Sequence, residues 1–407
     1  MLVLCSVTGS PSHGRAVLPF ARALGDAGHR VVVACPPDVA GVFDGAPVVV
    51  EPVLPTMADA AGHLGPVLAR LGGPAALATL TPAEATTALL PTLFAGPQVT
   101  GSARALLALV RAHGVPDLVL RDGGETAGFL VAEHLGVPCV AAPSGAGNVL
   151  APHVVADALT ERREELGFAV PDDPAALHRW GRLDCMPQQF SLAEPQVAPA
   201  RAFRQDDQVT RGETVPGWVA ALPGNRPLVL AGLGTAMPAM AGRAQRRAPV
   251  DPHAALRTVA EAASRLDAEV VLSTGGLPVD DLDLPPHVHP ASWVPQPLLL
   301  QVADLFLTHG GYNGIREAVR HGVPLAVLPQ FGDQEHNAGR VAELGLGSHC
   351  APDAAEIAAT CTRLLSDDDV RARIRSAQRA MLALPPVEDA VGVLEDLAAR
   401  RVAVLAA

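Results

Sequence analysis

Residues 305–330 read LFLTHGGYNGIREAVRHGVPLAVLPQ, and this stretch decides the class of fold. It begins with an apolar run of strand length at 305–308, turns at His309-Gly310-Gly311, and continues with helical spacing over 312–320. Gly322 can end that helix in the left-handed conformation, and Pro324 opens a second apolar run at 324–328. The order strand, helix, strand predicts a parallel α/β sheet.

The same alternation of short apolar runs and helical stretches continues on both sides of this unit. Apolar runs of strand length lie at 2–7, 30–35, 117–120 and 139–142 in the first half, and at 227–230, 269–273, 304–308 and 324–328 in the second. Gly-Val-Pro occurs at 114, 136 and 322, where each glycine can end a helix and each proline can open a strand. The pattern therefore predicts an α/β chain with two sets of strands.

A segment rich in Pro, Gln and Asp near the middle predicts a linker between two domains of similar size. We place the first domain at 1–205, the linker at 206–226, the second domain at 227–386 and a terminal helix at 387–407. The segments 53–100 and 145–200 lack strand patterns, so we expect long loops there that carry binding surfaces.

The composition excludes several classes of function. All 30 basic residues among the 407 are arginine, so chemistry that needs a lysine amine, such as a Schiff base or a Walker-A loop, is ruled out. A net charge of −12 makes a nucleic-acid partner unexpected. The six cysteines show no C-x-x-C spacing, which favours buried free thiols in a reducing cytoplasm. Residues 1–7 lack a basic start and no apolar run has the length of a membrane helix, so we expect neither a signal peptide nor a membrane span.

The glycine turn at 309–311 opens a helix at the carboxyl end of a strand, where backbone N–H groups and the helix dipole favour phosphate. His309, Asn313 and Glu317 follow at intervals of four residues and therefore share one helix face. Histidine and asparagine can donate to phosphate oxygens, whereas a carboxylate one turn further can accept from both hydroxyls of a ribose. This helix face therefore indicates a site that binds phosphate at the start of the helix and ribose one turn further along it.

Side chains on either side of this helix extend the same pattern. Asp333 and Gln334 follow the next strand and offer donors and acceptors for the hydroxyls of a sugar. Trp293 precedes the first strand and offers a flat surface on which a base could stack. These residues indicate a site for a nucleotide that carries a sugar.

The residues form the pattern W-x-P-Q at 293–296, H-G-G-x-N-x-x-x-E at 309–317 and G-V-P-x-x-x-x-P-x-x-x-D-Q at 322–334. This pattern resembles the donor-binding signature of family 1 glycosyltransferases, the inverting UDP-glycosyltransferase superfamily. The resemblance implies the GT-B fold, with two Rossmann-like α/β domains whose parallel sheets face each other across a cleft. The sequence as a whole also resembles actinobacterial enzymes that glycosylate natural products.

The resemblance implies a donor-binding role for each matching position. Trp293 and Val294 would contact the base, and Gln296 and Glu317 would contact the ribose. Asp333 and Gln334 would contact the sugar. The phosphates would be bound by His309, Gly311, Asn313, Gly314 and Thr235. Many members have serine where this chain has Gly314, so only the backbone could contact phosphate there.

The N-terminal region resembles the family where its catalytic base lies. The run SHGRA at 12–16 aligns His13 with the family's catalytic histidine, although the usual Gly and Pro of that motif are replaced. Asp122, at the end of an apolar run, matches the aspartate that pairs with this histidine. The resemblance implies that His13 takes the acceptor proton while Asp122 fixes its tautomer. Arg121 and Glu125 beside the pair are further candidates for acceptor contact.

These features predict an inverting, metal-independent hexosyltransferase. It would move a hexose or deoxy sugar from a UDP- or dTDP-linked donor to a hydroxyl of a small, largely apolar natural-product aglycone. The donor is a co-substrate, and we expect no cofactor and no metal. Retaining GT-B enzymes tend to carry two glutamates eight residues apart, and Leu325 stands eight residues after Glu317, which favours inversion. The oligomeric state stays open, with a homodimer as one candidate.

Two other functions and several structural roles stay open. The chain could be a GT-B-fold sugar-nucleotide epimerase, or a catalytically silent nucleotide-sugar-binding partner of another transferase. His13 could be structural, Asp122 could cap a helix, and Trp293 could fill the core. His287 and His289 are expected in a surface loop, because a zinc site needs more ligands than the sequence offers nearby.

Overall fold

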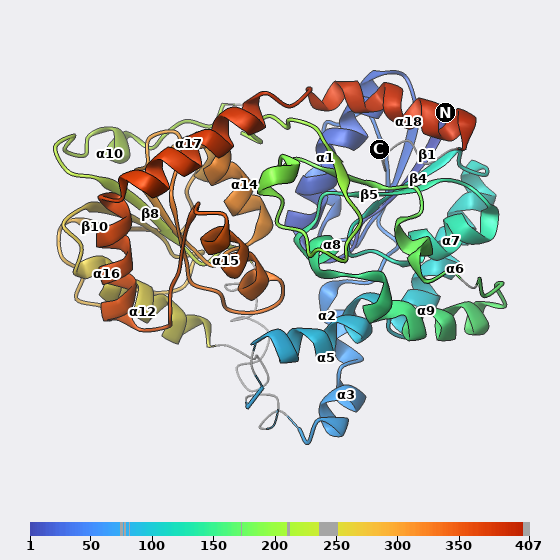
Figure 1. The fold of residues 1–407 in the computed structure, drawn as a ribbon, viewed down its shortest axis with the longest axis horizontal. Coiled ribbons are helices and arrows are strands. Elements are labelled where there is room, and N and C mark those ends of the chain that lie inside the picture. The colour runs from blue at the N-terminus through green and yellow to red at the C-terminus, as the bar shows by residue number, and fades with distance from the viewer. Residues whose placement is uncertain are drawn as a thin grey trace. The chain divides into compact units, whose positions relative to one another are not determined.

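The computed structural model describes residues 1–73, 76, 79–80, 82–171, 173–209, 212–235 and 251–401. The chain divides into two compact units, one formed by Met1–Gln205 with Leu384–Ala407 and the other by Asp206–Ala383. We call them the first and the second unit, and Figure 1 labels their elements.

The first unit contains a seven-stranded sheet in the order β3-β2-β1-β4-β5-β6-β7. Its strands are β1 (Leu2–Ser6), β2 (Arg30–Ala34), β3 (Val49–Glu51), β4 (Leu118–Asp122), β5 (Cys139–Ala142), β6 (Arg182–Asp184) and β7 (Ala200–Ala202). All neighbouring strands run parallel. The strand order reverses between β1 and β4, and ligands of open α/β sheets bind outside the carboxyl ends of strands at such a point.

The second unit contains a six-stranded parallel sheet in the order β10-β9-β8-β11-β12-β13. Its strands are β8 (Leu228–Gly232), β9 (Glu269–Ser273), β10 (Val288–Ala291), β11 (Leu305–Thr308), β12 (Leu325–Val327) and β13 (Gly347–His349). The order reverses between β8 and β11, so this sheet has a corresponding reversal point. The prediction of a parallel α/β fold is confirmed.

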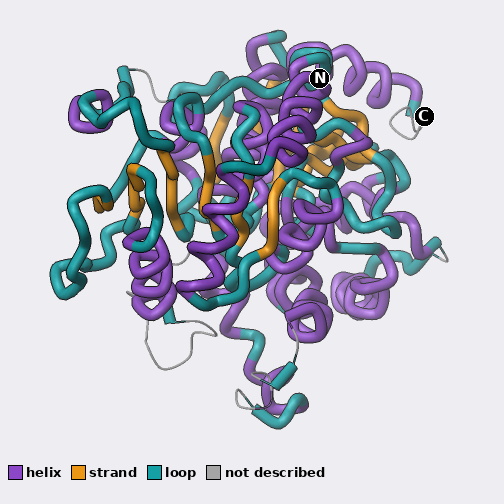
Figure 2. The backbone as a smooth tube through the Cα atoms, turned by 60° about the vertical axis from the view of Figure 1, so that its left-hand side comes forward, coloured by secondary structure: helices purple, strands orange, loops and turns teal. Residues whose placement is uncertain are grey.

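Helices connect the strands and flank them on both sides in Figure 2. Those of the first unit are α1 (Pro11–Asp26), α2 (Met57–Gly62), α3 (Gly65–Arg70), α5 (Pro82–Ala95), α6 (Gln98–His113), α7 (Ala127–Leu135), α8 (Gly145–Val149), α9 (Pro152–Leu166) and α18 (Ala390–Arg400), with short 3-10 turns η1 (Ala40–Phe43), η2 (Pro174–His178), η3 (Gln188–Phe190) and η4 (Val387–Asp389). Those of the second unit are α10 (Gly217–Ala220), α12 (Pro252–Ser264), α13 (Gln296–Leu300), α14 (Tyr312–His321), α15 (Gln334–Glu343), α16 (Ala354–Leu365) and α17 (Asp368–Leu382).

Successive residues of the first sheet enter different apolar clusters, because side chains alternate between the faces of a strand. Leu4 packs in a cluster that includes residues of α6, α7 and α9. Val3 and Cys5 pack in the other, together with residues of α1. Leu394 and Leu397 of α18 are fully buried in that second cluster, so α18 is part of the core, and it lies beside α1 in Figure 1.

The expectation of long loops at 53–100 and 145–200 is wrong. The first segment contains α2, α3 and α5, and the second contains α8, α9 and the short strands β6 and β7. Two local causes hid these elements from the sequence pattern. α5, PAEATTALLPTLFA, alternates little between apolar and polar faces, and strands of three residues are too short to show a period.

The glycines of the repeated Gly-Val-Pro tripeptide end helices as predicted. Gly136 and Gly322 adopt left-handed conformations directly after α7 and α14. Gly114 follows α6 with φ of 105° and an extended ψ. Such values favour glycine, so these positions fix where each helix stops and the next strand starts.

The six cysteines are free and buried, which confirms the prediction of unpaired thiols. Burial raises the pKa of the Cys5 and Cys139 thiols to about 12, so neither is a ready nucleophile.

One helical stretch of the described residues, Ala88–His113, is long and apolar enough to cross a membrane by length and composition alone. Gly96 and Pro97 divide it between α5 and α6, and 56% of its apolar window is buried inside the protein, as in a core helix. The absence of a membrane span stays a prediction.

Candidate functional site

The first unit brings His13 and Asp122 together. β1 and β4 are parallel neighbours, so the segments that follow their carboxyl ends lie at the same edge of the sheet. His13 lies in the first turn of α1, shortly after β1, and Asp122 is the last residue of β4. The Nδ1 atom of His13 lies 2.7 Å from Oδ2 of Asp122. The imidazole side chain is 19% exposed, whereas the carboxylate is fully buried.

Several contacts keep the Asp122 carboxylate ionised. Burial by itself raises the pKa of this group, but His13, the hydroxyl of Ser144 and the N–H of Gly124 together lower it below its usual range. An ionised carboxylate can only accept, so Nδ1 of His13 carries the proton. The second ring nitrogen, Nε2, is then the one with a lone pair that can take a proton.

The backbone beside His13 is adapted to the imidazole ring. Gly9 has φ of 83°, and a Cβ added there would lie 2.7 Å from Cδ2 of His13. The close approach and the positive φ both require glycine. The loop after β1 therefore holds the ring against the backbone while Asp122 fixes its orientation.

The prediction that Arg121 and Glu125 contact the acceptor is wrong. Arg121 is 0% exposed and its Nη1 donates to the carbonyls of Gly123 and Glu125, at 2.8 and 3.0 Å. Glu125 is 4% exposed and accepts from the hydroxyl of Ser6 at 2.5 Å. Both side chains shape the loop after β4 from the inside, so they act on the pair only through the backbone.

The second unit places its predicted donor residues at the carboxyl edge of its sheet. Thr235 follows β8, Trp293 follows β10, His309 follows β11 and Asp333 follows β12. Parallel strands end at one edge, so these four loops share it. The edge includes both strands of the reversal point, β8 and β11.

His309 lies in a slot between two glycines. A Cβ added at Gly234, where φ is 72°, would lie 2.3 Å from Cε1 of His309, and one at Gly311 would lie 2.5 Å from Nε2. Burial lowers the pKa of His309 to about 4, although the residue keeps some exposed surface. The ring is therefore neutral at pH 7 and can donate one N–H.

The N-terminus of α14 follows this histidine. Gly311 is the N-cap, and the first bond within the helix runs from the N–H of Ile315 to its carbonyl at 3.1 Å. The N–H groups of residues 312–314 precede that bond, and with the helix dipole they form a setting suited to an anion. Gly314 is buried, and a Cβ there would lie 3.2 Å from the ring of Phe306, so a larger residue would crowd the helix against β11.

The predicted ribose residues meet in the structure. Nε2 of Gln296 donates to Oε2 of Glu317 at 2.8 Å, which joins α13 to α14. Trp293 is 64% exposed, so the alternative that it fills the core is wrong. Val294 is 6% exposed and points into the fold, whereas Thr235 is exposed. Trp293 thus has the surface that stacking on a base requires.

The loop after β12, which carries the predicted sugar residues Asp333 and Gln334, depends on Asn337, a residue that the sequence pattern did not indicate. Asn337 is 0% exposed, and its Nδ2 donates to the carbonyl of Gly310 at 2.9 Å and to Oδ2 of Asp333 at 2.8 Å. Gln334 is 5% exposed, and its Oε1 accepts from the N–H groups of Gln330 and Phe331. Asn337 therefore ties the loop after β11 to the loop after β12. The signal available was its place one turn after Asp333.

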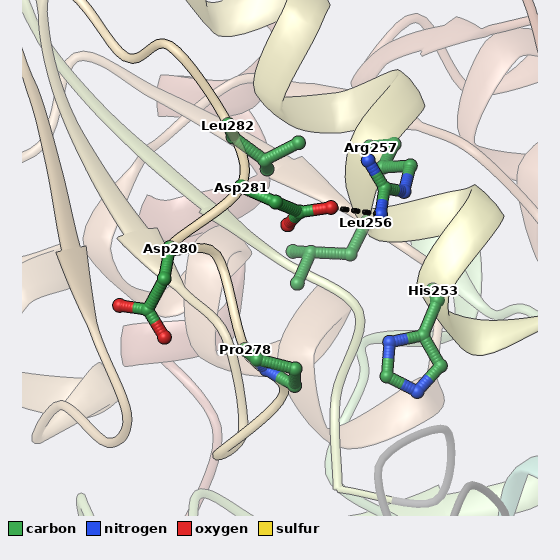
Figure 3. A pocket seen from close by; sticks show the side chains of 7 residues that line it. All are labelled: His253, Leu256, Arg257, Pro278, Asp280, Asp281 and Leu282. Atoms are coloured by element: carbon green, nitrogen blue, oxygen red, sulfur yellow. Dashed lines mark hydrogen bonds and ion pairs between the residues drawn. The ribbon is translucent and has the colours of Figure 1, made fainter.

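Two features of the second unit lie outside the predicted donor residues. His289 pairs with Glu269 at 2.8 Å, and among the described residues no three His, Cys, Asp or Glu side chains gather closely enough to hold a metal ion. A cavity of about 220 Å³ beside α12, shown in Figure 3, is lined by His253, Leu256, Arg257, Pro278, Asp280, Asp281 and Leu282. Arg257 and Asp281 form an ion pair on its rim, and it contains none of the predicted donor residues.

Comparison with known proteins places this geometry in a family. Residues 257–397 match the model of the erythromycin biosynthesis protein CIII-like C-terminal domain. The chain is 30% identical to the elloramycin glycosyltransferase ElmGT of Streptomyces olivaceus, over 67% of this chain and 66% of that protein. It superposes on the glycosyltransferase VinC in complex with dTDP with a TM-score of 0.69 and 23% identity, covering 98% of this chain and all of VinC. The chain belongs to the family 1 glycosyltransferases with the GT-B fold.

A second relative of this family 1 glycosyltransferase is the NDP-glycosyltransferase YjiC of Bacillus licheniformis, 30% identical over 54% of the chain and 51% of that protein. The chain thus covers between half and two thirds of the length of these two curated relatives. The family model spans the loops that carry Trp293, His309 and Asp333. The family match therefore lies mainly in the second unit and does not include the loops that carry His13 and Asp122.

Proposed function

We propose that this chain is an inverting glycosyltransferase in which His13 is the general base and Asp122 its partner. The observation that carries the proposal is the 2.7 Å contact between His13 Nδ1 and the buried carboxylate. An acceptor hydroxyl becomes a good nucleophile only as a base removes its proton, and a histidine oriented by a carboxylate suits this task near neutral pH. Attack on the anomeric carbon from the side opposite the leaving nucleoside diphosphate inverts that carbon.

The donor in this proposal is a UDP- or dTDP-linked hexose or deoxy sugar. The leaving diphosphate would receive the N–H groups at the start of α14, the N–H of His309 and the amide of Asn313. The Gln296–Glu317 pair would hold the ribose, and Asp333 the sugar. Support comes from the dTDP named with VinC. The charge of the leaving group is met by these donors, so the proposed reaction is independent of metal and cofactor.

The acceptor in this proposal is a small, largely apolar natural-product aglycone. Similar proteins support this class, since they include glycosyltransferases named for elloramycin and oleandomycin and a rhamnosyltransferase complexed with spinosyn aglycone. A cytoplasmic location and a homodimer remain predictions.

The test combines binding with turnover. The wild type is melted with UDP, dTDP and their sugars, where a ligand at 100 times its Kd adds about 2.7 kcal/mol of stability. It is then incubated with the stabilising donor and a panel of polyketide and flavonoid aglycones, and products are read by mass spectrometry and by the anomeric coupling in NMR. We expect a product of inverted configuration.

His13→Ala is the diagnostic variant, and His349→Ala, which changes a half-exposed histidine of β13, is its matched control. We expect the first to keep the nucleotide-induced stabilisation and lose product, and the control to keep both. Full turnover by His13→Ala would overturn the assignment of the base. A new sugar isomer from donor alone would favour an epimerase, and nucleotide binding without product across the panel would favour a silent partner.

A further inference from the structure

The second turn of α14 carries a buried cation at a position that the donor signature leaves unspecified. Arg316 is 5% exposed and lies three residues after Asn313. Its Nε donates to Oδ1 of Asn313 at 3.0 Å. A guanidinium has only donors, so the amide oxygen of Asn313 faces Arg316 and the amide nitrogen points elsewhere. The contact therefore fixes the orientation of the Asn313 amide, with Oδ1 toward Arg316.

The guanidinium of Arg316 reaches back to Asn313 in the first turn of α14, where the helix dipole disfavours a positive charge. The N-terminal end of a helix carries partial positive charge, so acidic side chains stabilise the first turns and basic ones the last. α14 follows that rule at its other end, with Arg320 and His321 in its last turn. Arg316 is the exception, and it becomes favourable when an anion binds at the N-terminus, because the dipole and the guanidinium then attract the same charge.

The donor segments contain little other positive charge. Residues 232–235, 293–296, 309–317 and 329–334 include one arginine, Arg316, and no lysine. Burial lowers the pKa of His309 to about 4, so this neighbour is uncharged at neutral pH. Within these segments the formal positive charge for a diphosphate therefore rests on Arg316.

We propose that Arg316 is a positioning residue for the donor diphosphate. It orients the Asn313 amide so that Nδ2 faces the phosphates, and it adds its own charge to the N-terminus of α14. This inference rests on the proposed function and extends it to a residue outside the matched signature.

The variants separate charge from orientation. Arg316→Gln removes the charge, Arg316→Lys keeps the charge without the fork of donors, and Asn313→Ala removes the amide. The double variant Asn313→Ala/Arg316→Gln completes a cycle. Arg375→Gln is the matched control for net charge, because Arg375 is an exposed arginine of α17 outside the donor segments. Thermal melts without ligand check that each variant folds.

The readouts are the Kd of dTDP and UDP by calorimetry at low and high salt, and kcat and KM with the donor sugar. We expect Arg316→Gln to weaken both diphosphates about tenfold, to raise the donor KM by a similar factor and to change kcat little, with a smaller loss at high salt. Arg316→Lys should recover part of the affinity. In the Asn313→Ala background the cost of Arg316→Gln should fall to about threefold, since the positioned amide is absent.

Three results would overturn the inference: wild-type affinity in Arg316→Gln, fully additive losses in the cycle, or an equal loss in Arg375→Gln. Failure of the proposed function gives a different result, because the wild type itself would then bind neither dTDP nor UDP. If the wild type binds dTDP or UDP and Arg316→Gln binds them with the same affinity, the proposed function stands and the role of Arg316 is rejected.

Discussion

Each unit has a histidine at the reversal point of its sheet, after the first of the two strands in one unit and after the second in the other. His13 follows β1 and His309 follows β11, and each strand lies at the point where the strand order of its sheet reverses. Each ring also lies against a glycine with positive φ, Gly9 at 83° and Gly234 at 72°. Similar backbone designs thus present the same side chain at the carboxyl edge of both sheets.

The partners of the two rings differ. His13 is bonded through Nδ1 to the buried carboxylate of Asp122, whereas the nearest polar contact of the His309 ring given by the structure is the Thr308 hydroxyl at 3.5 Å. A carboxylate stabilises a protonated imidazole, while burial without one lowers the pKa of His309 to about 4. The comparison teaches that one residue type is suited to accept a proton in one unit and to donate a hydrogen bond to an anion in the other.

The largest effect should come from removing the carboxylate that distinguishes the two sites. Asp122→Asn leaves the shape of His13's neighbour intact but can stabilise the wrong tautomer and no longer supports an imidazolium. We expect kcat to fall about 10²- to 10⁴-fold, with the Kd of UDP or dTDP unchanged. Steady-state kinetics and calorimetry on the same preparation measure both.

A parallel loss of nucleotide affinity in Asp122→Asn would contradict the division of roles. Ser144→Ala is a useful companion, because it removes one hydrogen bond to the carboxylate and keeps the charge. Its effect on kcat should be smaller than that of Asp122→Asn.

The second effect should appear at the donor histidine. His309→Ala removes one neutral N–H from the diphosphate, which corresponds to about 30-fold in donor affinity for a hydrogen bond to a charged group. Because the pKa of His309 is about 4, affinity for the nucleotide sugar should be level between pH 6 and 9. A titration of donor affinity that disappears in His309→Ala would contradict the neutral role.

A third pair of variants applies one substitution to both loops. Gly9→Ala would press on the His13 ring and Gly234→Ala on the His309 ring, since the added Cβ atoms lie 2.7 and 2.3 Å from them. We expect about tenfold lower kcat in the first and about tenfold weaker donor binding in the second, each with the strain of a positive φ.

Gly28→Ala and Gly276→Ala are matched controls for that strain. Both glycines have positive φ, 85° and 87°, and a Cβ at either meets nothing within 4 Å. They should lose stability without the change in kcat or in donor affinity. If Gly9→Ala altered donor binding alone, the assignment of the two rings would have to be exchanged.

The sequence predicted the elements around both histidines well, because each signal there is local. The apolar runs at 2–7 and 305–308 are each followed by a glycine turn, and the structure has strands at Leu2–Ser6 and Leu305–Thr308. The W-x-P-Q, H-G-G and D-Q motifs depend on spacing along the chain, so they could be read directly. The roles of the site residues stay predictions, although the contacts His13–Asp122 and Gln296–Glu317 are present.

What the sequence could not provide depends on contacts between distant segments. Asn337 bonds the carbonyl of Gly310, 27 residues before it, and Arg121 turns inward to bond backbone carbonyls instead of facing an acceptor. The helices within 53–100 were missed because Ala, Leu and Pro on all faces of α5 leave little period to detect. Their packing against the rest of the first unit supplies what the local pattern lacks.

The smallest effect concerns stability in mild acid, where a histidine of each unit, His178 and His309, has a lowered pKa. His178 of the first unit has a pKa of about 3 because of burial and the nearby charges of Arg121 and Arg182, and His309 of the second unit has one of about 4. Below about pH 6.5 these histidines bind protons in the unfolded chain but not in the folded one. Their contribution to the free energy of unfolding is therefore fully present above that pH and is lost as the pH falls. Asp122, whose pKa is lowered from an ordinary value near 4, makes stability depend on pH only at lower pH than the histidines do.

We therefore expect the free energy of unfolding to fall by about 1 kcal/mol for each of the two histidines between pH 7.5 and pH 5.5. Urea unfolding across this range measures the slope in the wild type, in His178→Gln and in His309→Gln. Each variant should show a shallower slope than the wild type, while His349→Ala, at a half-exposed position, should keep it. Equal slopes in all four proteins would mean that both rings accept protons without unfolding, and the assignment of His309 as a neutral hydrogen-bond donor would then lose its basis in burial.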